Sequence, residues 1–572
     1  MTRSRSTWKI EQSEAVGERG MIAAKHPLSA EVGAEILRAG GNAIDAAVAT
    51  AFAESVVEPA MTGIGGGGNM VIAMATGETV AIEYGMKSPA AARPDMYELL
   101  PGHDTDGFGW RNTLDEANIW GHRSVAVPGT VAGLCLALRE YGTMPLAEVV
   151  TPAIRIAREG FPVTFFEVMH IGLQAHRLRR FPATAEILLR PYQGDWKVPS
   201  LDPPDKIVQT DLARTLEQIA RLGPDGFYRG EVADLIDQDM REHGGSLTAS
   251  DLTAYRPRVS RPGFVGRYRG FEILTAPWGN GGITALQSLR ILEGFDVRAM
   301  GHNSPEYLHV FIEAARRAFA DRFVHVADPD VADVPWRGLM SDEYAASRRA
   351  EIDPARASAS YEAGDPWPYQ GSPSGRRVTT GVDPRSDHQT THLCAMDGQG
   401  NAVSLTQTLM STFGSRVVAA GTGVILNNGM MWFDPEPGHA NSVAPHKRPL
   451  SNMVPLIAIH DGRAELVVGA SGGRKIINCV TQLVLNVIDH QMGIQAAISA
   501  PRIDCSTRDT LIDDRLEAEV VERVRSLGHS AQLRTESFAP HLWASQVGIL
   551  TGADGRRHGG VHRYYPAVAI GV

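Results

Sequence analysis

The spacing of apolar residues along the chain predicts helices and strands mixed throughout, rather than one repeated element. Residues 29–38 have helical spacing behind a serine suited to an N-cap, and Gly40, Gly41 and Asn42 end that run. Further helices are predicted at 43–56, 131–141, 145–159, 211–222 and 304–322, and apolar strands at 455–459, 465–469 and 566–571. This mixture indicates a layered α/β or α+β fold.

Residues 353–388 break the pattern. They are dense in Pro, Gly, Ser and Asp and show neither helical nor strand periodicity, which predicts a loop or a linker without fixed structure. A structureless loop of this length inside a compact domain is unusual, and such loops tend to be functional or to mark a boundary.

A β-hairpin is predicted directly after this break. Residues 390–397 form the first strand, 398–400 the turn and 401–409 the second strand. A two-residue turn would pair Thr408 with Thr391, whereas a three-residue turn with Gly400 in the left-handed conformation would pair Thr408 with Thr390. The glycine favours the second alternative, but one sequence leaves the register open.

Composition narrows the class of protein. The 572 residues are 43% hydrophobic and 21% charged, as in globular proteins, and the net charge of -10 without a basic block argues against nucleic acid as a partner. No apolar run reaches about 18 residues and no apolar segment follows the basic N-terminus, so we expect no membrane partner, no signal peptide and a cytoplasmic location.

The cysteines and histidines suggest neither a metal nor a cofactor. Cys135, Cys394, Cys479 and Cys505 lack zinc-like spacing and lie in apolar contexts, which predicts small buried side chains. The histidines, among them His392, His439 and His446, also lack metal-ligand spacing.

The threonines of the predicted hairpin carry the candidate chemistry. A threonine hydroxyl needs a base, and cleavage of the peptide bond before Thr390 would supply one, because an α-amine has a pKa of about 7.7–8.0. A second hydroxyl opposite could orient the nucleophile. On residue type alone, Thr390, Thr391, Thr406 and Thr408 are more simply explained as β-branched strand residues.

Motifs in one consistent order, from about residue 20 to the C-terminus, favour the catalytic interpretation of these threonines over the structural one. They are GGNAIDAAVA (40–49), GIGGGGNM (63–70), VPGTVAG (127–133), YGTMPL (141–146), TTHLCAMDGQGNAVSLTQT (390–408), FGS (413–415), LNNGMMWF (426–433), KRPLSNMVP (447–455) and GASGGRKI (469–476). Together they resemble the γ-glutamyltranspeptidase family of N-terminal-nucleophile hydrolases.

The resemblance implies an α+β fold, the four-layer αββα sandwich, and a zymogen that cleaves itself between Gln389 and Thr390. The products would be a large subunit, 1–389, ending in a flexible linker over 353–389, and a small subunit, 390–572. Both would belong to one αββα unit, and processed units could form a homodimer.

The resemblance also assigns roles to residues. Thr390 would be the nucleophile, its own α-amine the base and Thr408 the supporting hydroxyl. Gly472 and Gly473 match the pair whose N–H groups form the oxyanion hole, a role that suits residues without a Cβ. Ser451 and Asn452 match a polar pair that lines the acyl pocket. Without the resemblance, these four residues would be interpreted as turn and loop positions.

The chain departs from the family where the γ-glutamyl group would bind. Gly85, Met410, Gly429 and Trp432 stand where the family has Arg, Asn, Gln and Asp. A buried unpaired charge costs several kcal/mol, so a zwitterionic acyl group should be rejected. Lys87, Arg474 and Lys475 could supply a cation, but we expect all three at exposed positions. Met410, Met430, Met431 and Trp432 are equally consistent with an acyl pocket and with plain core.

The expected function is therefore that of the transpeptidase-like amidohydrolases, which include cephalosporin (glutaryl) acylases and oxamate amidohydrolase. The substrate would be a small amide that acylates Thr390, and no cofactor is implied. True γ-glutamyl transfer is the alternative. A dinucleotide site at residues 63–68 is disfavoured because a helix precedes the glycines and a strand follows them, the reverse of the required order. A binding protein without activity would not need the threonine and glycine pairs together.

Overall fold

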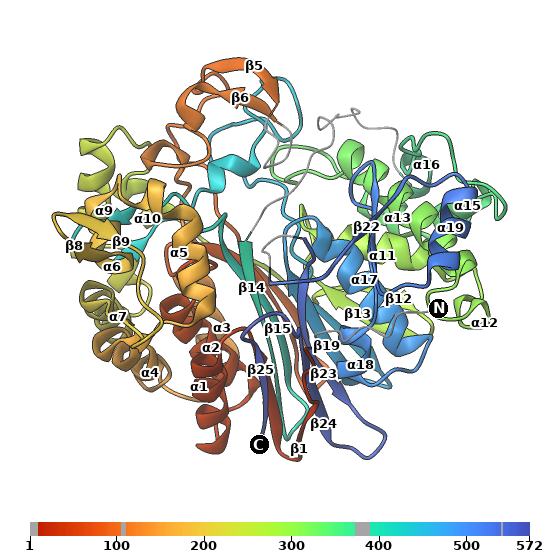
Figure 1. The fold of residues 1–572 in the computed structure, drawn as a ribbon, viewed down its shortest axis with the longest axis horizontal. Coiled ribbons are helices and arrows are strands. Elements are labelled where there is room, and N and C mark those ends of the chain that lie inside the picture. Colours follow the sequence, from red (N-terminus) through yellow and green to blue (C-terminus); the bar gives the residue numbers. More distant parts are fainter. Residues whose placement is uncertain (1–9, 104–109, 372–388, 539–541) are drawn as a thin grey trace, which may run out of the picture.

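The computed structural model describes residues 10–103, 110–371, 389–538 and 542–572. Within these residues, two seven-stranded antiparallel sheets face each other at the centre of the molecule (Figure 1). The first contains, in pairing order, β1 (Ala15–Gly17), β24 (Arg557–Val561), β23 (Ser545–Thr551), β19 (Arg463–Ser471), β18 (Leu456–His460), β13 (Phe271–Thr275) and β12 (Phe264–Tyr268). The second contains β11 (Arg258–Ser260), β4 (Thr79–Tyr84), β3 (Gly67–Ala73), β15 (Ala402–Met410), β14 (Gln389–Asp397), β2 (Gly20–Ala24) and β25 (Val568–Gly571).

Helices cover the outer face of each sheet (Figure 1). Over the second sheet lie α1 (Pro27–Arg38), α2 (Ala43–Val57), α3 (Thr130–Tyr141), α4 (Leu146–Glu159), α5 (Phe165–Leu178), α6 (Pro182–Leu188), α7 (Thr210–Leu222), α8 (Asp225–Tyr228), α9 (Glu231–Glu242) and α10 (Ala249–Ala254). On the other side lie α11 (Gly281–Leu292), α12 (Val297–Met300), α13 (Pro305–His325), α14 (Trp336–Met340), α15 (Asp342–Ala350), α16 (Trp367–Gln370), α17 (Lys475–Ile488), α18 (Ile494–Ser499) and α19 (Ala518–Ser526).

Short elements complete the described chain. They are β5 (Leu99–His103), β6 (Arg111–Thr113), β7 (Phe161–Pro162), β8 (Arg190–Tyr192), β9 (Asp195–Lys197), β10 (Lys206–Ile207), β16 (Val418–Ala419), β17 (Val424–Ile425), β20 (Ile503–Asp504), β21 (Thr510–Asp513), β22 (Ala531–Arg534) and the 3-10 turns η1 (Leu114–Glu116), η2 (His122–Ser124) and η3 (Gly429–Trp432). Among the described helices, none is both long and apolar enough to cross a membrane.

Three apolar layers hold this arrangement together. One lies between the first group of helices and the second sheet, one between the other helices and the first sheet, and the third between the two sheets. The layer between the sheets includes Val71, Cys394, Ile457, Val467 and Ile549. The four-layer αββα sandwich expected from the sequence is therefore confirmed.

Burial on both faces explains the composition of the central strands. Every residue of β14 and of β15 is buried, because a helix layer covers one face of their sheet and the opposite sheet covers the other. Helix α2 is likewise buried along its whole length, and its small Ala side chains allow close contact with α1, α4 and β14. Asn42 and Asp45 start this helix with a capping box.

The hairpin has the register of the three-residue turn. Thr391 lies opposite Gln407 and His392 opposite Thr406, and Gly400 has a φ of 98°. A bulge between Gln389 and Thr391 shifts the pairing of the first strand residue to Met410. The favoured alternative of the sequence prediction is thus correct, and Thr390 and Thr408 lie side by side.

The other predicted elements can be compared directly. The predicted helices correspond to α1, α2, α3, α4, α7 and α13, and the predicted strands to β18, β19 and β25, with ends that differ by a few residues. All four cysteines are buried and unpaired, as expected. A Cβ on Gly66 would lie 2.2 Å from the Thr408 carbonyl oxygen, so close backbone packing explains the glycine loop.

The predicted linker is only partly as expected. Ser358 donates its backbone N–H to Glu313 of α13, Tyr361 donates its hydroxyl to the same carboxylate, and Gly364 donates its N–H to Asp321. These contacts hold the described part, 353–371, against α13, so a flexible linker is the wrong description there. Residues 372–388 lie outside the described residues.

Candidate active site

The two threonine hydroxyls meet at the carbonyl group of Gln389. Thr390 Oγ1 donates to the Gln389 oxygen at 2.7 Å and Thr408 Oγ1 donates to it at 2.5 Å, while the two hydroxyl oxygens are 3.4 Å apart. The Met410 N–H donates to Thr408 Oγ1 at 2.7 Å, which leaves the Thr408 proton directed at the carbonyl oxygen. Because Thr408 can stabilise negative charge on that oxygen, the arrangement suits attack on the Gln389–Thr390 bond.

Local backbone geometry produces this convergence. The bulge at Gln389 and Thr391 lies at the start of β14, and Met410, the last residue of β15, has a φ of 94°. A non-glycine residue in this region of φ is strained, and such residues cluster at functional sites. The strained residue ends β15, two residues beyond Thr408.

Thr391, the neighbour of Thr390 on β14, faces the helix layer. Thr391 Oγ1 donates to Glu58 Oε2 at 2.6 Å, and Glu58 caps the end of α2. Glu54, one turn earlier, accepts the backbone N–H of Lys25 at 3.3 Å. Sequence reasoning missed these three charged residues, although Glu54 and Glu58 are visible as acids spaced i, i+4 in an otherwise apolar segment.

Burial governs the protonation of this cluster. It raises the pKa of Glu58 to about 7, against the opposing effect of the Thr391 hydrogen bond. It raises the pKa of Glu54 well above the ordinary value, with Glu58 adding to the effect. It also lowers the pKa of Lys25 to about 7, against the attraction of Glu58. The cluster therefore exchanges protons near neutral pH.

The glycine pair lies at the end of β19, close to the same carbonyl group. Gly472 and Gly473 have φ values of 131° and 62°, conformations that suit glycine. Gly472 and Gln389 both line a cavity of about 50 Å³. Gly472 therefore lies on the wall of the same cavity as Gln389, while Gly473 precedes α17.

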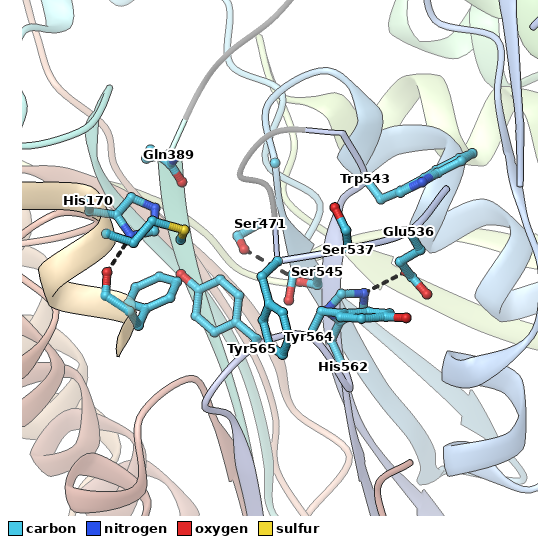
Figure 2. A pocket seen from close by; sticks show the side chains of 14 residues that line it. His170, Gln389, Ser471, Glu536, Ser537, Trp543, Ser545, His562, Tyr564 and Tyr565 are labelled. Atoms are coloured by element: carbon cyan, nitrogen blue, oxygen red, sulfur yellow. Dashed lines mark hydrogen bonds and ion pairs between the residues drawn. The ribbon is translucent and has the colours of Figure 1, made fainter. Parts of the chain in front are cut away.

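The far wall of this cavity comes from C-terminal residues that sequence reasoning did not single out. Figure 2 shows Gln389 on one side and Glu536, Trp543 and His562 across from it. His562 Nε2 lies 2.8 Å from Glu536 Oε1, and burial lowers the pKa of His562 to about 4, so the ring is neutral. Burial alone would raise the pKa of Glu536, but Arg502 and its other partners hold it well below the usual range.

Ser451 and Asn452 are buried on a loop that a buried arginine holds. Arg322 of α13 donates to the Ser451 carbonyl oxygen at 2.6 Å and approaches Asn452 Oδ1 at 3.4 Å. Burial, with Arg474 adding, lowers the pKa of Arg322 to about 9, still above neutrality. A cation therefore lies behind the expected acyl pocket, bound to neutral oxygen atoms.

The methionine and tryptophan side chains form a packed apolar cluster. Met410, Met430, Met431 and Trp432 are all buried, in contact with a set that includes Met86 and Met453. The Trp432 Nε1 atom has no hydrogen-bond partner among the described residues. In this uncleaved chain the four side chains act as core, and neither they nor the Ser451–Asn452 pair line the cavity beside Gln389.

The candidate replacement cations are not all exposed, contrary to expectation. Arg474 and Lys475 are buried at the start of α17, where the Arg474 guanidinium lies 5.1 Å from the centre of the Phe323 ring. Lys87 is intermediate in exposure. Packing of α17 against the first sheet buries two basic side chains that the sequence alone would place in solvent.

One group of two carboxylates and a histidine has the residue types of a metal site. Asp434, Glu436 and His439 offer ligand atoms within 4.8 Å of one another, with Asp434 Oδ2 2.7 Å from His439 Nδ1. Two similar groups of side chains occur elsewhere in the described residues, His122–Asp239–His243 and His309–Glu313–His529. In the part of the chain that the structure describes, none of these three groups includes Thr390 or Thr408.

The fold and this site together define an N-terminal-nucleophile hydrolase. Comparison with known proteins makes the assignment specific, because the sequence profile described as Gamma-glutamyltranspeptidase matches residues 29–564. The chain is 39% identical over 548 residues to the Acylase ACY 1 proenzyme of Pseudomonas sp. (strain V22), covering 95% of this chain and 93% of the relative. It is 36% identical over 560 residues to the Glutathione hydrolase proenzyme of Escherichia coli (strain K12), covering 95% and 90%.

A solved structure agrees over the whole chain. The cephalosporin acylase from Bacillus halodurans superposes with a TM-score of 0.83 at 27% identity, covering 100% of this chain and 99% of that one. The chain therefore belongs to the γ-glutamyltranspeptidase family and is an enzyme of the amide-hydrolysing, N-terminal-nucleophile type.

Proposed function

We propose that the chain is a self-processing amidohydrolase that uses Thr390 as its N-terminal nucleophile. The observation that carries this proposal is the convergence of Thr390 and Thr408 on the carbonyl oxygen of Gln389. The names of relatives described as proenzymes support processing of the precursor into subunits.

Self-cleavage proceeds as an acyl shift followed by hydrolysis. Thr390 Oγ1 attacks the Gln389 carbonyl carbon, the carbon–nitrogen bond breaks, and the hydroxyl proton is transferred to the departing nitrogen of Thr390. The resulting ester then reacts with water to give a carboxylate at Gln389 and a free amine at Thr390. Thr408 stabilises the negative oxygen in both steps through its hydrogen bond.

Turnover of a substrate repeats this chemistry with the new amine as base. The amine takes the proton of Thr390 Oγ1 as the oxygen attacks the substrate carbonyl, and it delivers the proton to the leaving amine. Water then attacks the acyl carbon and gives a proton to the amine, the bond between that carbon and Thr390 Oγ1 breaks, and the amine returns the proton to Oγ1 as the acid is released. Thr408 and the N–H groups of Gly472 and Gly473 are the proposed donors to the tetrahedral oxyanion, and the subunits 1–389 and 390–572 remain one folded unit.

We further propose that the acyl group is not γ-glutamyl. Met410 and Trp432 belong to an apolar cluster where the α-ammonium group would need acceptors, and Gly85 offers no cation for the α-carboxylate. An acyl group without an α-ammonium group, such as the glutaryl or oxamate type of dicarboxylic monoamide, avoids the first penalty. The alternative is γ-glutamyl transfer, which the similarity to glutathione hydrolases favours.

Two experiments test these proposals. Purified wild-type protein should give two bands on a denaturing gel, with Thr390 at the N-terminus of the smaller band, whereas Thr390→Ala should give one inactive chain. A single full-length band from active protein would refute self-processing. Incubation with glutaryl and γ-glutamyl 4-nitroanilides tests the acyl group, and preferential turnover of the γ-glutamyl compound would establish the alternative.

A further inference from the structure

A cluster of buried ionisable side chains lies beside Thr391, the residue that follows the proposed nucleophile. Lys25, Glu54, Glu58 and Thr391 are at most 1% exposed, and they come from the end of β2, from α2 and from β14. The Lys25 ammonium group donates to the Ser545 carbonyl oxygen at 2.6 Å and lies 4.4 Å from the centre of the Tyr565 ring. One helix layer and the sheet beneath it therefore bring these groups together beside β14, the strand that begins with Gln389.

The cluster also forms part of the cavity wall. Ser545 and Tyr565, the two residues that contact the Lys25 ammonium group, line the cavity beside Gln389 and Gly472 (Figure 2). The charges of the cluster are thus separated from the reacting bond by a single layer of side chains. Screening by solvent salt is weak at such buried positions.

The carboxyl groups of this cluster are only partly hydrogen-bonded. Glu58 Oε2 accepts from Thr391, but Glu58 Oε1 and Glu54 Oε2 have no hydrogen-bond partner among the described residues. Unpaired buried carboxylates are costly, so the cluster holds protons that exposed carboxyl groups would release. Packing alone is served as well by apolar side chains of similar volume, so these groups call for another explanation.

We propose that Glu58 and Lys25 are positioning residues for the nucleophile, in which Glu58 fixes Thr391 while the two opposite charges set the protonation of the Thr390 amine after self-cleavage. This inference rests on the proposed function. Bond lengths and the 2.6 Å hydrogen bond limit the distance from the Thr390 nitrogen to the Glu58 carboxyl oxygen to about 10 Å. At that range a buried charge still changes the proton affinity of an amine.

The sign of each effect follows from the charge. An ionised Glu58 stabilises the ammonium form of Thr390 and so raises the pH at which the amine becomes a base. A charged Lys25 acts in the opposite direction. Other groups face the pair from every neighbouring element: Glu54 on α2, Glu167 on α5, Thr391, His392 and Cys394 on β14, His562 and Tyr565 after β24, Cys479 on α17 and Arg502 before β20.

The test is the pH dependence of kcat/KM, whose acid limb reports the base of the free enzyme. It uses self-cleaved protein and whichever of the two 4-nitroanilides the wild type hydrolyses. Glu58→Gln should move the acid limb to lower pH by about half a unit or more, and Lys25→Met should move it to higher pH by a similar amount. Asp321→Asn, a buried carboxyl group on α13 in the opposite helix layer, is the matched control and should leave the limb in place.

A second pair of variants tests the hydrogen bond itself. Thr391→Val should lower kcat about tenfold or more, and Thr391→Ser, which keeps the donor to Glu58, should restore kcat. If one charge variant does not accumulate as folded protein, the other and the Thr391 pair still decide the question. Shifts in the same direction, or no shift, from Glu58→Gln and Lys25→Met would overturn the inference.

Different results would refute the proposed function and this further inference. Wild-type protein that is active without cleavage at Gln389–Thr390 would refute the proposed function and this inference with it. If the wild type is cleaved there, but neither charge variant moves the acid limb of kcat/KM, the inference alone is refuted.

Discussion

Replacement of Thr408 by valine is the sharpest test of the carbonyl geometry. Valine preserves the shape of the side chain and its β-branch, so the burial of β15 is unchanged. The change removes the 2.5 Å hydrogen bond to the Gln389 oxygen and leaves the Met410 N–H without its acceptor. Both consequences can be measured separately.

The expected magnitudes follow from these contacts. Loss of one oxyanion donor costs on the order of 100- to 1000-fold in rate, and self-cleavage should slow by about that factor. The orphaned Met410 N–H costs about 1–3 kcal/mol of folding stability. The assay follows the decay of the full-length band on denaturing gels after refolding, together with the unfolding midpoint in denaturant.

Two controls make the result interpretable. Thr406→Val, two residues earlier on β15, loses a 2.8 Å contact with His392 but no contact with the carbonyl group, so it should match the stability loss and still cleave. Thr408→Ser retains the hydroxyl and should cleave at a rate close to the wild type. If Thr408→Val cleaves within about threefold of Thr406→Val, Thr408 does not stabilise the oxyanion.

Three further predictions follow from neighbouring contacts. Gly66→Ala would place a Cβ 2.2 Å from the Thr408 carbonyl oxygen, so it should displace Thr408, slow self-cleavage on gels and lower the melting temperature. Gly172→Ala, at a position of α5 with open space for a Cβ, should not slow cleavage. Arg322→Met should raise KM and cost about 2–4 kcal/mol, because the carbonyl oxygens of Asn280 and Ser451 lose their buried donor, and unchanged steady-state kinetics would contradict that role. In the Thr390→Ala background, the double variant Lys25→Met/Glu58→Gln should be more stable than its parent. This gain in stability should be largest near pH 7, as measured by denaturant titrations at pH 5, 7 and 9. Stability from Glu58 is lost as pH rises from 4.5 to about 7, by at most about 3 kcal/mol, and stability from Lys25 is lost as pH falls from 10.5 to about 7, by at most about 5 kcal/mol. A difference in stability that is independent of pH would refute this reasoning.

The site was only partly predictable. The threonine pair and the glycine pair carry local signals, since the Gly400 turn sets the register and motif order sets the family. Glu58 shows only its i, i+4 spacing from Glu54 in an apolar segment, and Lys25 shows no signal, because these groups come together only when α2 and the end of β2 pack beside β14. The cavity wall from Ser537 to Tyr565 was missed for the same reason: its residues lie about 150 positions from Gln389 in the chain.

The sequence by itself determined the local elements, the hairpin with its left-handed glycine and the family, because these depend on periodicity, turn chemistry and the order of motifs. Only the tertiary structure decided which side chains are buried together. It buried Arg474, Lys475 and the Glu54–Glu58 pair, packed Met410 and Trp432 as core, and ordered 353–371 against α13. The physical reason is that burial and proton affinity depend on what the opposing layer brings, and in a four-layer sandwich the opposing layer comes from distant parts of the chain.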